Sequence, residues 1–156
     1  TPHIIKKIKD HTIDKKYTTK HVTTVDKEHF KPVIEGLFGV YNEGTARSLR
    51  VEGIDICGKT GTAENFTKIN GVRTQLTDHS IFVAFAPKDN PKIAIAVFVE
   101  NGYWGARWAG PIASLMIEKY LRGKITRTDL EKRMLEGSLE NEYAKVTSGQ
   151  PFSINH

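Results

Sequence analysis

The chain has 156 residues, of which 38% are hydrophobic and 26% are charged, and it contains one cysteine. This length supports one substantial hydrophobic core, and the composition is that of a globular domain with a charged surface. The longest apolar run, residues 93–99, is far shorter than the roughly 20 residues that a membrane-crossing helix needs, and a single cysteine excludes a disulfide within the chain.

The net charge of +5 would suit an anionic partner such as nucleic acid or a membrane surface. However, the basic residues are spread along the chain and acidic residues stand between them. We therefore interpret the charge as a solvated basic surface and expect no nucleic-acid partner. The histidines and the cysteine lack the spacing of metal ligands, so we expect neither a metal nor a cofactor.

The first elements that the pattern predicts are an extended pair and a helix. The pair is His3–Lys9 and Tyr17–Thr24, both rich in Ile, Val and Thr. Asp26 then caps a helix that runs to about Tyr41, because apolar residues recur there at helical spacing and predict one buried face. Gly36 and Gly39 would allow another backbone to approach this helix closely.

Three strands follow, at residues 54–60, 80–86 and 93–100. A tight polar turn joins the last two, which predicts an antiparallel hairpin. Their nearly continuous apolar character predicts central strands that are covered on both faces. The polar residues 65–78 between the first two strands are interpreted as a solvated connector.

A helix is predicted at residues 109–121, with Pro111 in its first turn and Gly123 just past its end. Its expected sheet-facing residues are Ile112, Leu115, Met116 and Tyr120. Thr128 and Glu131 form a capping box for a short last helix. The residues from 138 onward are polar, and we expect them to be loosely held.

Together these elements predict an α/β fold of the α+β type, with helices packed on an antiparallel sheet. We expect residues 1–125 to belong to one domain portion and residues 126–156 to form a short helix and a polar tail.

The stretch GIDICGKTGTA, residues 53–63, contains two motifs. Gly53, Gly58, Lys59 and Thr60 match the phosphate-loop pattern, which requires a buried strand before the loop and a helix after it. Lys59, Thr60 and Gly61 also form the K-T-G signature of serine acyl-transferases that react with penicillin. The residues before Gly53 do not resemble a buried strand and a polar stretch follows Gly61, so the second interpretation is favoured.

A wider resemblance supports that choice. The segments EGLFGVYNEGTA, GKTGTAE, HSIFVAFAPKDNPKIAIAVFVENG and PIASLMIEKYL resemble the C-terminal part of the penicillin-binding protein transpeptidase domain, over about residues 1–121. The resemblance is strongest to the elongation-type class B group, the penicillin-binding protein 2 subfamily. Tyr103 and Arg107 depart from it, because such families often have small residues there.

The resemblance implies a fold of the β-lactamase and transpeptidase type. In such enzymes a serine attacks the carbonyl of a D-Ala-D-Ala stem peptide of peptidoglycan, and the acyl group passes to an amine on a neighbouring strand. β-Lactam antibiotics mimic the donor peptide. The implied location is the periplasmic face of the bacterial inner membrane, through an anchor outside this chain. The implied partners also include the remainder of the transpeptidase domain and membrane proteins of the elongation machinery.

By the same analogy, each residue of the motif has a role. Lys59 supplies positive charge for the substrate's carboxylate and for proton transfer. Thr60 and Thr62 offer hydroxyl groups, and the Thr62 N–H is one donor of the oxyanion hole. Gly61 leaves room for substrate to lie along the strand, and Ala63 begins the rim of the cleft.

Two catalytic elements of such enzymes are not found in the sequence. No serine has a lysine three residues later, as the S-x-x-K nucleophile motif requires. The S-x-N pattern occurs only at Ser153–Asn155, in the polar tail, and we interpret this match as accidental. We therefore expect the chain to be a fragment that cannot be acylated by penicillin on its own.

Several alternatives stay open at this stage. A serine β-lactamase and a β-lactam sensor share the fold, and they differ in how fast the acyl-enzyme is hydrolysed. A nucleotide- or nucleic-acid-binding module is the alternative from another class. Trp104 and Trp108 either line the cleft or pack under the last helix, and packing is favoured.

Overall fold

A computed structural model describes residues 9–142 of the chain. The chain divides into two units, residues 1–31 and residues 32–156. The predicted domain boundary after residue 125 stays a prediction. None of the helices in the described part is long and apolar enough to cross a membrane.

The described part of the first unit contains no strand, so the predicted strand Tyr17–Thr24 is wrong. Helix α1, Lys15–Thr18, occupies the start of that segment, and a 3₁₀ turn, η1, follows at Lys27–His29. The physical reason is local capping, because the Asp14 side chain accepts a hydrogen bond from Lys16 N at 3.0 Å and so favours a helical turn. The partner strand predicted at His3–Lys9 lies, except for Lys9, outside the described residues.

Helix α2, Phe30–Asn42, confirms the predicted helix and its end near Tyr41. The predicted cap is wrong, because Asp26 precedes η1 and its side chain makes no capping hydrogen bond. Only its second half contributes to the core, since Val33 is 56% exposed while Tyr41 is 2% exposed. No atom lies within 4 Å of a Cβ added at Gly36 or Gly39, so the predicted close approach of a second backbone is wrong within the described residues.

The main sheet has the strand order β1-β4-β5, and both pairs are antiparallel. Its strands are β1, Cys57–Ala63; β4, His79–Ala86; and β5, Ile93–Val99. The predicted hairpin of β4 and β5 is confirmed. The first predicted strand begins three residues later than expected and continues through the whole K-T-G motif to Ala63.

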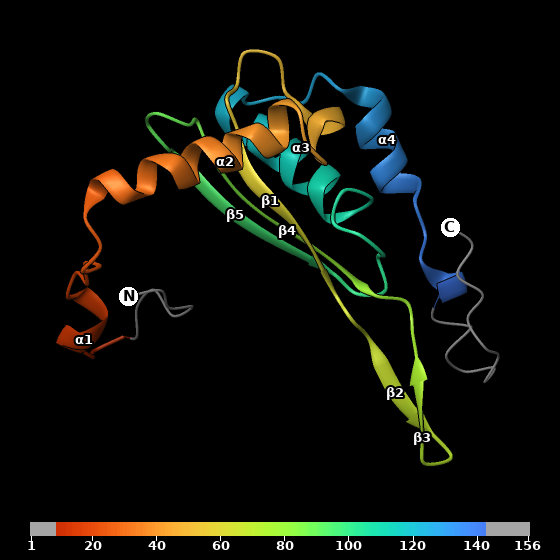
Figure 1. The fold of residues 1–156 in the computed structure, drawn as a ribbon. Coiled ribbons are helices and arrows are strands. Elements are labelled where there is room, and N and C mark those ends of the chain that lie inside the picture. The colour runs from red at the N-terminus through yellow and green to blue at the C-terminus, as the bar shows by residue number, and fades with distance from the viewer. Residues whose placement is uncertain (1–8, 143–156) are drawn as a thin grey trace. The chain divides into compact units, whose positions relative to one another are not determined.

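A second, two-stranded sheet occupies the segment that was predicted to be a connector. Strands β2, Phe66–Ile69, and β3, Val72–Gln75, extend beyond the end of the main sheet (Figure 1). Asn70 and Gly71 both have positive φ, at 51° and 82°, as a type I′ hairpin turn requires.

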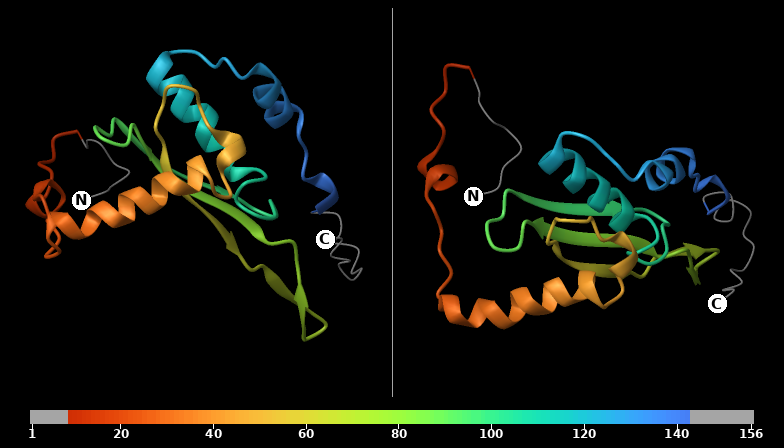
Figure 2. Two further views of the ribbon diagram at one scale, coloured as in Figure 1. Left: turned by 45° about the horizontal axis from the view of Figure 1, so that its top comes forward. Right: turned by 90° about the horizontal axis from the view of Figure 1, so that it is seen from above.

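Helix α3, Ala109–Arg122, covers one face of the main sheet (Figure 2). Gly123, with φ of 75°, ends the helix in the left-handed conformation that its position predicted. Met116 and Tyr120 are 53% and 62% exposed, so their predicted sheet-facing position is wrong. Ala113 and Ile117 occupy that position and are completely buried.

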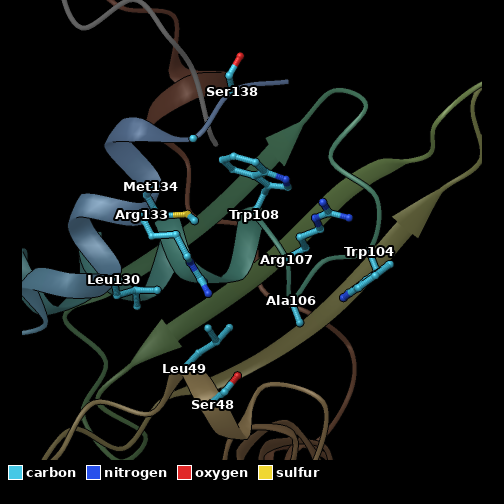
Figure 3. Close-up of a pocket in the computed structure, with 11 residues that line it drawn as sticks. Ser48, Leu49, Trp104, Ala106, Arg107, Trp108, Leu130, Arg133, Met134 and Ser138 are labelled. Atoms are coloured by element: carbon cyan, nitrogen blue, oxygen red, sulfur yellow. The ribbon is translucent and has the colours of Figure 1, made fainter. Parts of the chain in front are cut away.

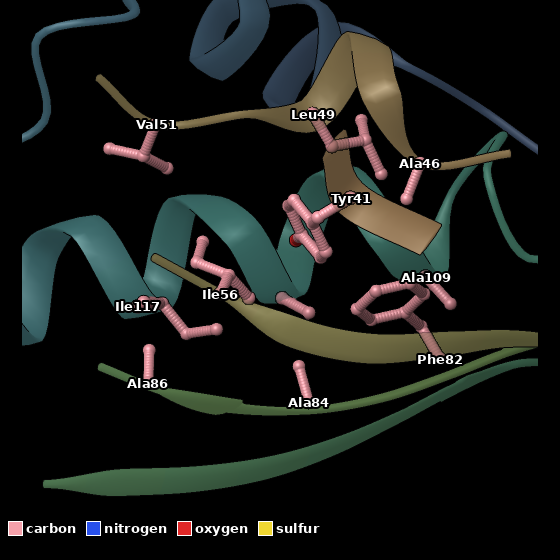
Figure 4. Packing of buried hydrophobic residues seen from close by; sticks show 11 residues of the cluster. Tyr41, Ala46, Leu49, Val51, Ile56, Phe82, Ala84, Ala86, Ala109 and Ile117 are labelled. Atoms are coloured by element: carbon pink, nitrogen blue, oxygen red, sulfur yellow. The ribbon is translucent and has the colours of Figure 1, made fainter. Parts of the chain in front are cut away.

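The core lies between this face of the sheet, α3 and the segment from Tyr41 to Ile56 (Figure 4). Phe82 is at its centre, and its ring lies 5.8 Å from the Tyr41 ring in an edge-to-face arrangement. Small residues on the neighbouring elements, Ala84, Ala86, Ala109 and Ala113, let the helix pack closely on the strands.

Much of the opposite face of the sheet is left exposed by the described residues, which contradicts the prediction that both faces are buried. Its end at Cys57 is covered, because Cys57 is completely buried and its Sγ lies 3.7 Å from the Ile34 carbonyl oxygen of α2. Val83 and Phe98 on that face are 45% and 55% exposed. An apolar sheet face of this kind is normally packed against another layer.

Helix α4, Thr128–Glu136, follows α3 and confirms the predicted last helix. The predicted capping box is wrong, because the N-cap residue is Arg127 and no side chain caps the helix. Residues 138–142 are held more firmly than predicted, since Glu142 accepts hydrogen bonds from Thr77 Oγ1 at 2.8 Å and from Tyr103 Oη at 2.7 Å. Residues 143–156, with the accidental S-x-N match, lie outside the described part.

Candidate functional site

The five predicted site residues, Lys59 to Ala63, form the second half of β1. β1 is an edge strand, because β4 pairs with one side of it and no described strand occupies the other. The strand continues past Thr60 and no helix begins there, so the structure does not support the phosphate-loop interpretation.

The direction of the main-chain groups of β1 follows from a close contact. A Cβ added at Gly105 would lie 2.9 Å from the Gly61 carbonyl oxygen and 3.0 Å from the Gly61 nitrogen, and closer still to the Ile81 carbonyl oxygen. Ile81 is the residue that opposes Gly61 on β4. Both polar main-chain groups of Gly61 therefore lie on the β4 side of the strand.

Main-chain groups of successive residues point to opposite sides of a strand. The N–H and C=O groups of Thr60 and Thr62 therefore point toward the unpaired edge of β1. A side-chain contact agrees with this direction, because Lys59 Nζ donates a hydrogen bond to the Thr60 carbonyl oxygen at 2.7 Å. This contact also places the Lys59 ammonium group at the same edge.

The side chains of the motif divide between the two faces of the sheet. Thr60 opposes the core residue Phe82, and its Oγ1 lies 3.1 Å from Thr45 Oγ1. Lys59 opposes Val83 on the uncovered face and makes no ion pair with any residue of the described part. Thr62 is exposed, whereas Gly61 and Ala63 are partly buried.

The space around Gly61 would accept a small side chain. An added Cβ would lie 3.4 Å from Ile81 Cβ, which is an ordinary contact distance. The described residues therefore do not explain why this position lacks a side chain.

The loop at residues 100–108 packs against the motif strand, and sequence reasoning did not identify its contacts. Ser80, which is completely buried, donates from Oγ to the Trp104 carbonyl oxygen at 3.0 Å and accepts from Ala109 N at 3.1 Å. Asn101 and Tyr103 have positive φ values of 54° and 63°, which are uncommon for residues other than glycine. No sequence signal pointed to Gly105, whose backbone lies directly on Gly61.

The end of the motif strand is tied to the same loop. Asn65 Nδ2 donates to Asn101 Oδ1 at 2.8 Å and to the Thr77 carbonyl oxygen at 3.2 Å. His79 Nδ1 accepts a hydrogen bond from Asn101 N at 3.1 Å, which gives this histidine a structural role. These bonds fix the strand, the start of the β2–β3 hairpin and the loop as one unit.

Cys57, at the start of β1, is completely buried. Burial raises the pKa of its thiol above the ordinary value, so the group is held in its neutral form. Within residues 9–142 no group of His, Cys, Asp or Glu side chains is arranged to hold a metal ion.

Comparisons with known proteins give the family of the chain. The sequence model described as "Penicillin binding protein transpeptidase domain" matches residues 1–118. The chain is 29% identical over 142 residues to the peptidoglycan D,D-transpeptidase MrdA of Haemophilus influenzae, which covers 83% of this chain and 22% of that protein. It is 41% identical over 88 residues to MrdA of Acinetobacter baumannii, which covers 50% of this chain and 13% of that protein.

Two solved structures have a similar fold. Penicillin-binding protein A from Mycobacterium tuberculosis, as an imipenem acyl-enzyme complex, matches with a TM-score of 0.50 and 32% identity, over 62% of this chain and 20% of that chain. Penicillin-binding protein 2B from Streptococcus pneumoniae matches with a TM-score of 0.52 and 28% identity, over 64% of this chain and 16% of that chain.

The chain spans about a fifth or less of the length of the curated MrdA relatives that it matches. The family match covers the motif strand, the β4–β5 hairpin and most of α3. On this basis the chain belongs to the penicillin-binding protein transpeptidase domain family.

Proposed function

We propose that the chain supplies one wall of the active site of a peptidoglycan D,D-transpeptidase that also binds β-lactam antibiotics. One observation carries the proposal: the K-T-G motif lies on an edge strand whose polar main-chain groups at Thr60 and Thr62 point to an unpaired side. The D,D-transpeptidase names of the relatives and the imipenem acyl-enzyme of the similar structure support it.

The donor peptide lies along this edge as an additional strand, which uses the free N–H and C=O groups of β1. The Lys59 ammonium group attracts the carboxylate of the D-Ala-D-Ala end, and the Thr62 hydroxyl accepts or donates a hydrogen bond there. The Thr62 N–H stabilises the oxyanion formed when the serine attacks, a contribution of roughly 3 kcal/mol in comparable sites.

The serine nucleophile and the S-x-N motif belong to the remainder of the transpeptidase domain. That remainder covers the apolar face of the sheet around Val83 and Phe98, which the described residues leave exposed. The complete enzyme acts at the periplasmic face of the bacterial inner membrane, with membrane proteins of the elongation machinery as its partners.

Labelling with a fluorescent penicillin tests the proposal. The longest protein that contains this chain, the long form, is expected to form a covalent adduct with the penicillin. The 156-residue chain alone is expected to form none. Lys59→Ala should slow labelling of the long form at least tenfold, because the loss of one charge-assisted contact costs roughly 1.5–3 kcal/mol. Lys92→Ala, at an exposed turn, is the matched control.

Four outcomes would count against the proposal. A long form that penicillin does not label, or a Lys59→Ala variant labelled at the normal rate, contradicts it. An adduct hydrolysed within seconds indicates a β-lactamase instead. Saturable binding of magnesium-ATP that Lys59→Ala abolishes would favour a nucleotide-binding module.

A further inference from the structure

An open cavity of about 580 Å³ lies between α4, the loop at 104–108 and the residues Ser48 and Leu49 (Figure 3). The family match ends at residue 118, so α4 contributes a wall that is not part of the matched region. The loop contributes Arg107. The matched family region therefore does not account for every wall of the cavity.

The charges around the cavity are all positive. Arg107 and Arg133 line it, and no acidic side chain does. Within residues 9–142 neither guanidinium group forms an ion pair or donates a hydrogen bond. The Arg107 guanidinium is instead stacked on the Tyr103 ring at 4.3 Å and lies 5.6 Å from the Trp104 ring. Stacking orients this guanidinium and leaves its N–H groups available at the rim.

The remaining lining is mostly aromatic and apolar, with Ser48 and Ser138 as its other polar side chains. Trp104 and Trp108 contribute indole rings, and α4 contributes Leu130 and Met134. Trp108 Nε1 is buried without a hydrogen-bond partner in the described part. Because this nitrogen has no accessible surface, it faces protein atoms and not the open cavity. Trp104 is 57% exposed, so the predicted packing under the last helix is wrong for this residue. The Trp108 ring lies against Gly137, directly after α4, as predicted.

The cavity adjoins the motif strand through the loop that lines it. Gly105 lies between Trp104 and Ala106, which both line the cavity, and its backbone contacts Gly61 of the motif. A ligand in the cavity is thus held next to the strand on which the acyl donor lies in the proposed function.

We propose that this cavity binds a carboxylate group of a second wall peptide, the one that accepts the acyl group. The two unpaired guanidinium groups match a carboxylate in charge, and the indole and methionine side chains offer apolar surface to the aliphatic part of the peptide. The assignment of the carboxylate to a wall peptide rests on the proposed function. The cationic and aromatic character of the cavity does not depend on it.

The test uses the longest protein that contains this chain, first acylated with penicillin so that the donor site is blocked. The probe is a soluble disaccharide-tripeptide from peptidoglycan, which lacks the D-Ala-D-Ala end, and its affinity is measured by isothermal titration calorimetry. Arg107→Gln and Arg133→Gln should each weaken binding about tenfold or more. Lys132→Gln makes the same charge change on the other side of α4, where its partner is Glu136, and should change affinity less than twofold.

A second measurement does not depend on any variant. The carboxamide form of the same probe, with its carboxylates neutralised, should bind the unchanged protein at least tenfold more weakly. Binding should also change the tryptophan fluorescence of the 156-residue chain, because both of its tryptophans line the cavity.

Equal affinity of the acid and carboxamide probes, or no effect of both arginine substitutions, overturns the inference. Inorganic phosphate that displaces the probe at equal concentration also overturns it, because the site would then be a general anion site. Failure of penicillin to acylate the protein overturns the proposed function alone. Binding of the probe that depends on Arg107 and Arg133 would still support the cavity in that case.

Discussion

The backbone of Gly105 lies directly on the backbone of Gly61, so that an added Cβ at Gly105 would come within 3.0 Å of both the amide nitrogen and the carbonyl oxygen of Gly61. Gly105 follows the sheet in the chain, whereas Gly61 is the last residue of the K-T-G motif in β1. The contact makes the position of the motif depend on a loop that has no part in the motif itself.

Replacement of Gly105 should therefore move the motif strand. In Gly105→Ala the methyl group meets backbone atoms of β1 and β4, which cannot rotate away, and we expect a loss of about 1–3 kcal/mol in the free energy of unfolding. The rate of penicillin acylation of the long form should fall by a larger factor than the fraction of folded protein does. Urea unfolding and acylation kinetics measure the two effects.

Gly36→Ala is the control for this substitution. No atom lies within 4 Å of the added methyl group in α2, and alanine favours a helix interior by roughly 0.5–1 kcal/mol. This variant should be as stable as the unchanged protein or more so. A Gly105→Ala variant that behaves in the same way would show that the contact is not restrictive.

Gly61→Ala should separate folding from function. Its methyl group fits at 3.4 Å from Ile81 Cβ, so we expect the free energy of unfolding to change by less than about 1 kcal/mol. Acylation by penicillin should nevertheless fall, because the methyl group occupies space that the donor peptide needs beside the strand. Normal acylation of a folded Gly61→Ala protein would place the donor elsewhere.

Glu118, on α3, should make stability depend on acid pH. Its side chain is completely buried, accepts a hydrogen bond from Thr126 Oγ1 at 2.5 Å, and pairs with Arg127 Nε at 2.9 Å. Burial alone would raise the pKa of this carboxyl group, but the bonds from Thr126 and Arg127 outweigh it and lower the pKa. The ionised form is thus favoured in the folded state.

Because the pKa of Glu118 is lower in the folded state, ionisation of this carboxyl group stabilises the fold. The stabilisation is complete above the pKa of an unfolded glutamate, about 4.3, and it is lost as the pH falls through the lower pKa of the folded state. Glu118→Gln should cost about 3 kcal/mol at pH 7, since it leaves the partly buried Arg127 without its charge partner. It should also reduce the slope of stability against pH below about pH 4.3. Urea unfolding at several pH values tests both, with the exposed Glu136→Gln, expected to change stability by under about 0.5 kcal/mol, as control.

Elements with a strong local pattern could be predicted from the sequence. The β4–β5 hairpin and α3 were found because long apolar runs and the Pro111 and Gly123 signals agree with the final packing. The β2–β3 hairpin was missed although Asn70–Gly71 is a strong turn signal, because its strands are short and polar. The segment at Tyr17 was predicted wrongly, because β propensity there is weaker than the local cap of Asp14.

The site could be predicted in part. The motif letters and the family resemblance located Lys59 to Thr62, and the structure places them on one edge strand. Gly105 and the cavity beside α4 could not be predicted, because they depend on contacts between segments distant in the chain. The exposure of Met116 also depends on tertiary packing, since α3 has apolar residues on more than one face.

The most direct test of the account replaces the Thr62 residue of the long form with its α-hydroxy acid analogue, which converts the N–H group into an ester oxygen and leaves the side chain unchanged. If that N–H points to the unpaired edge and donates to the oxyanion, acylation by penicillin should slow roughly 100-fold, with little change in the free energy of unfolding. The same replacement at Gly61, whose N–H lies on the β4 side, should instead lower the free energy of unfolding by about 1 kcal/mol. An ester at Thr62 that leaves the acylation rate unchanged would contradict the central claim.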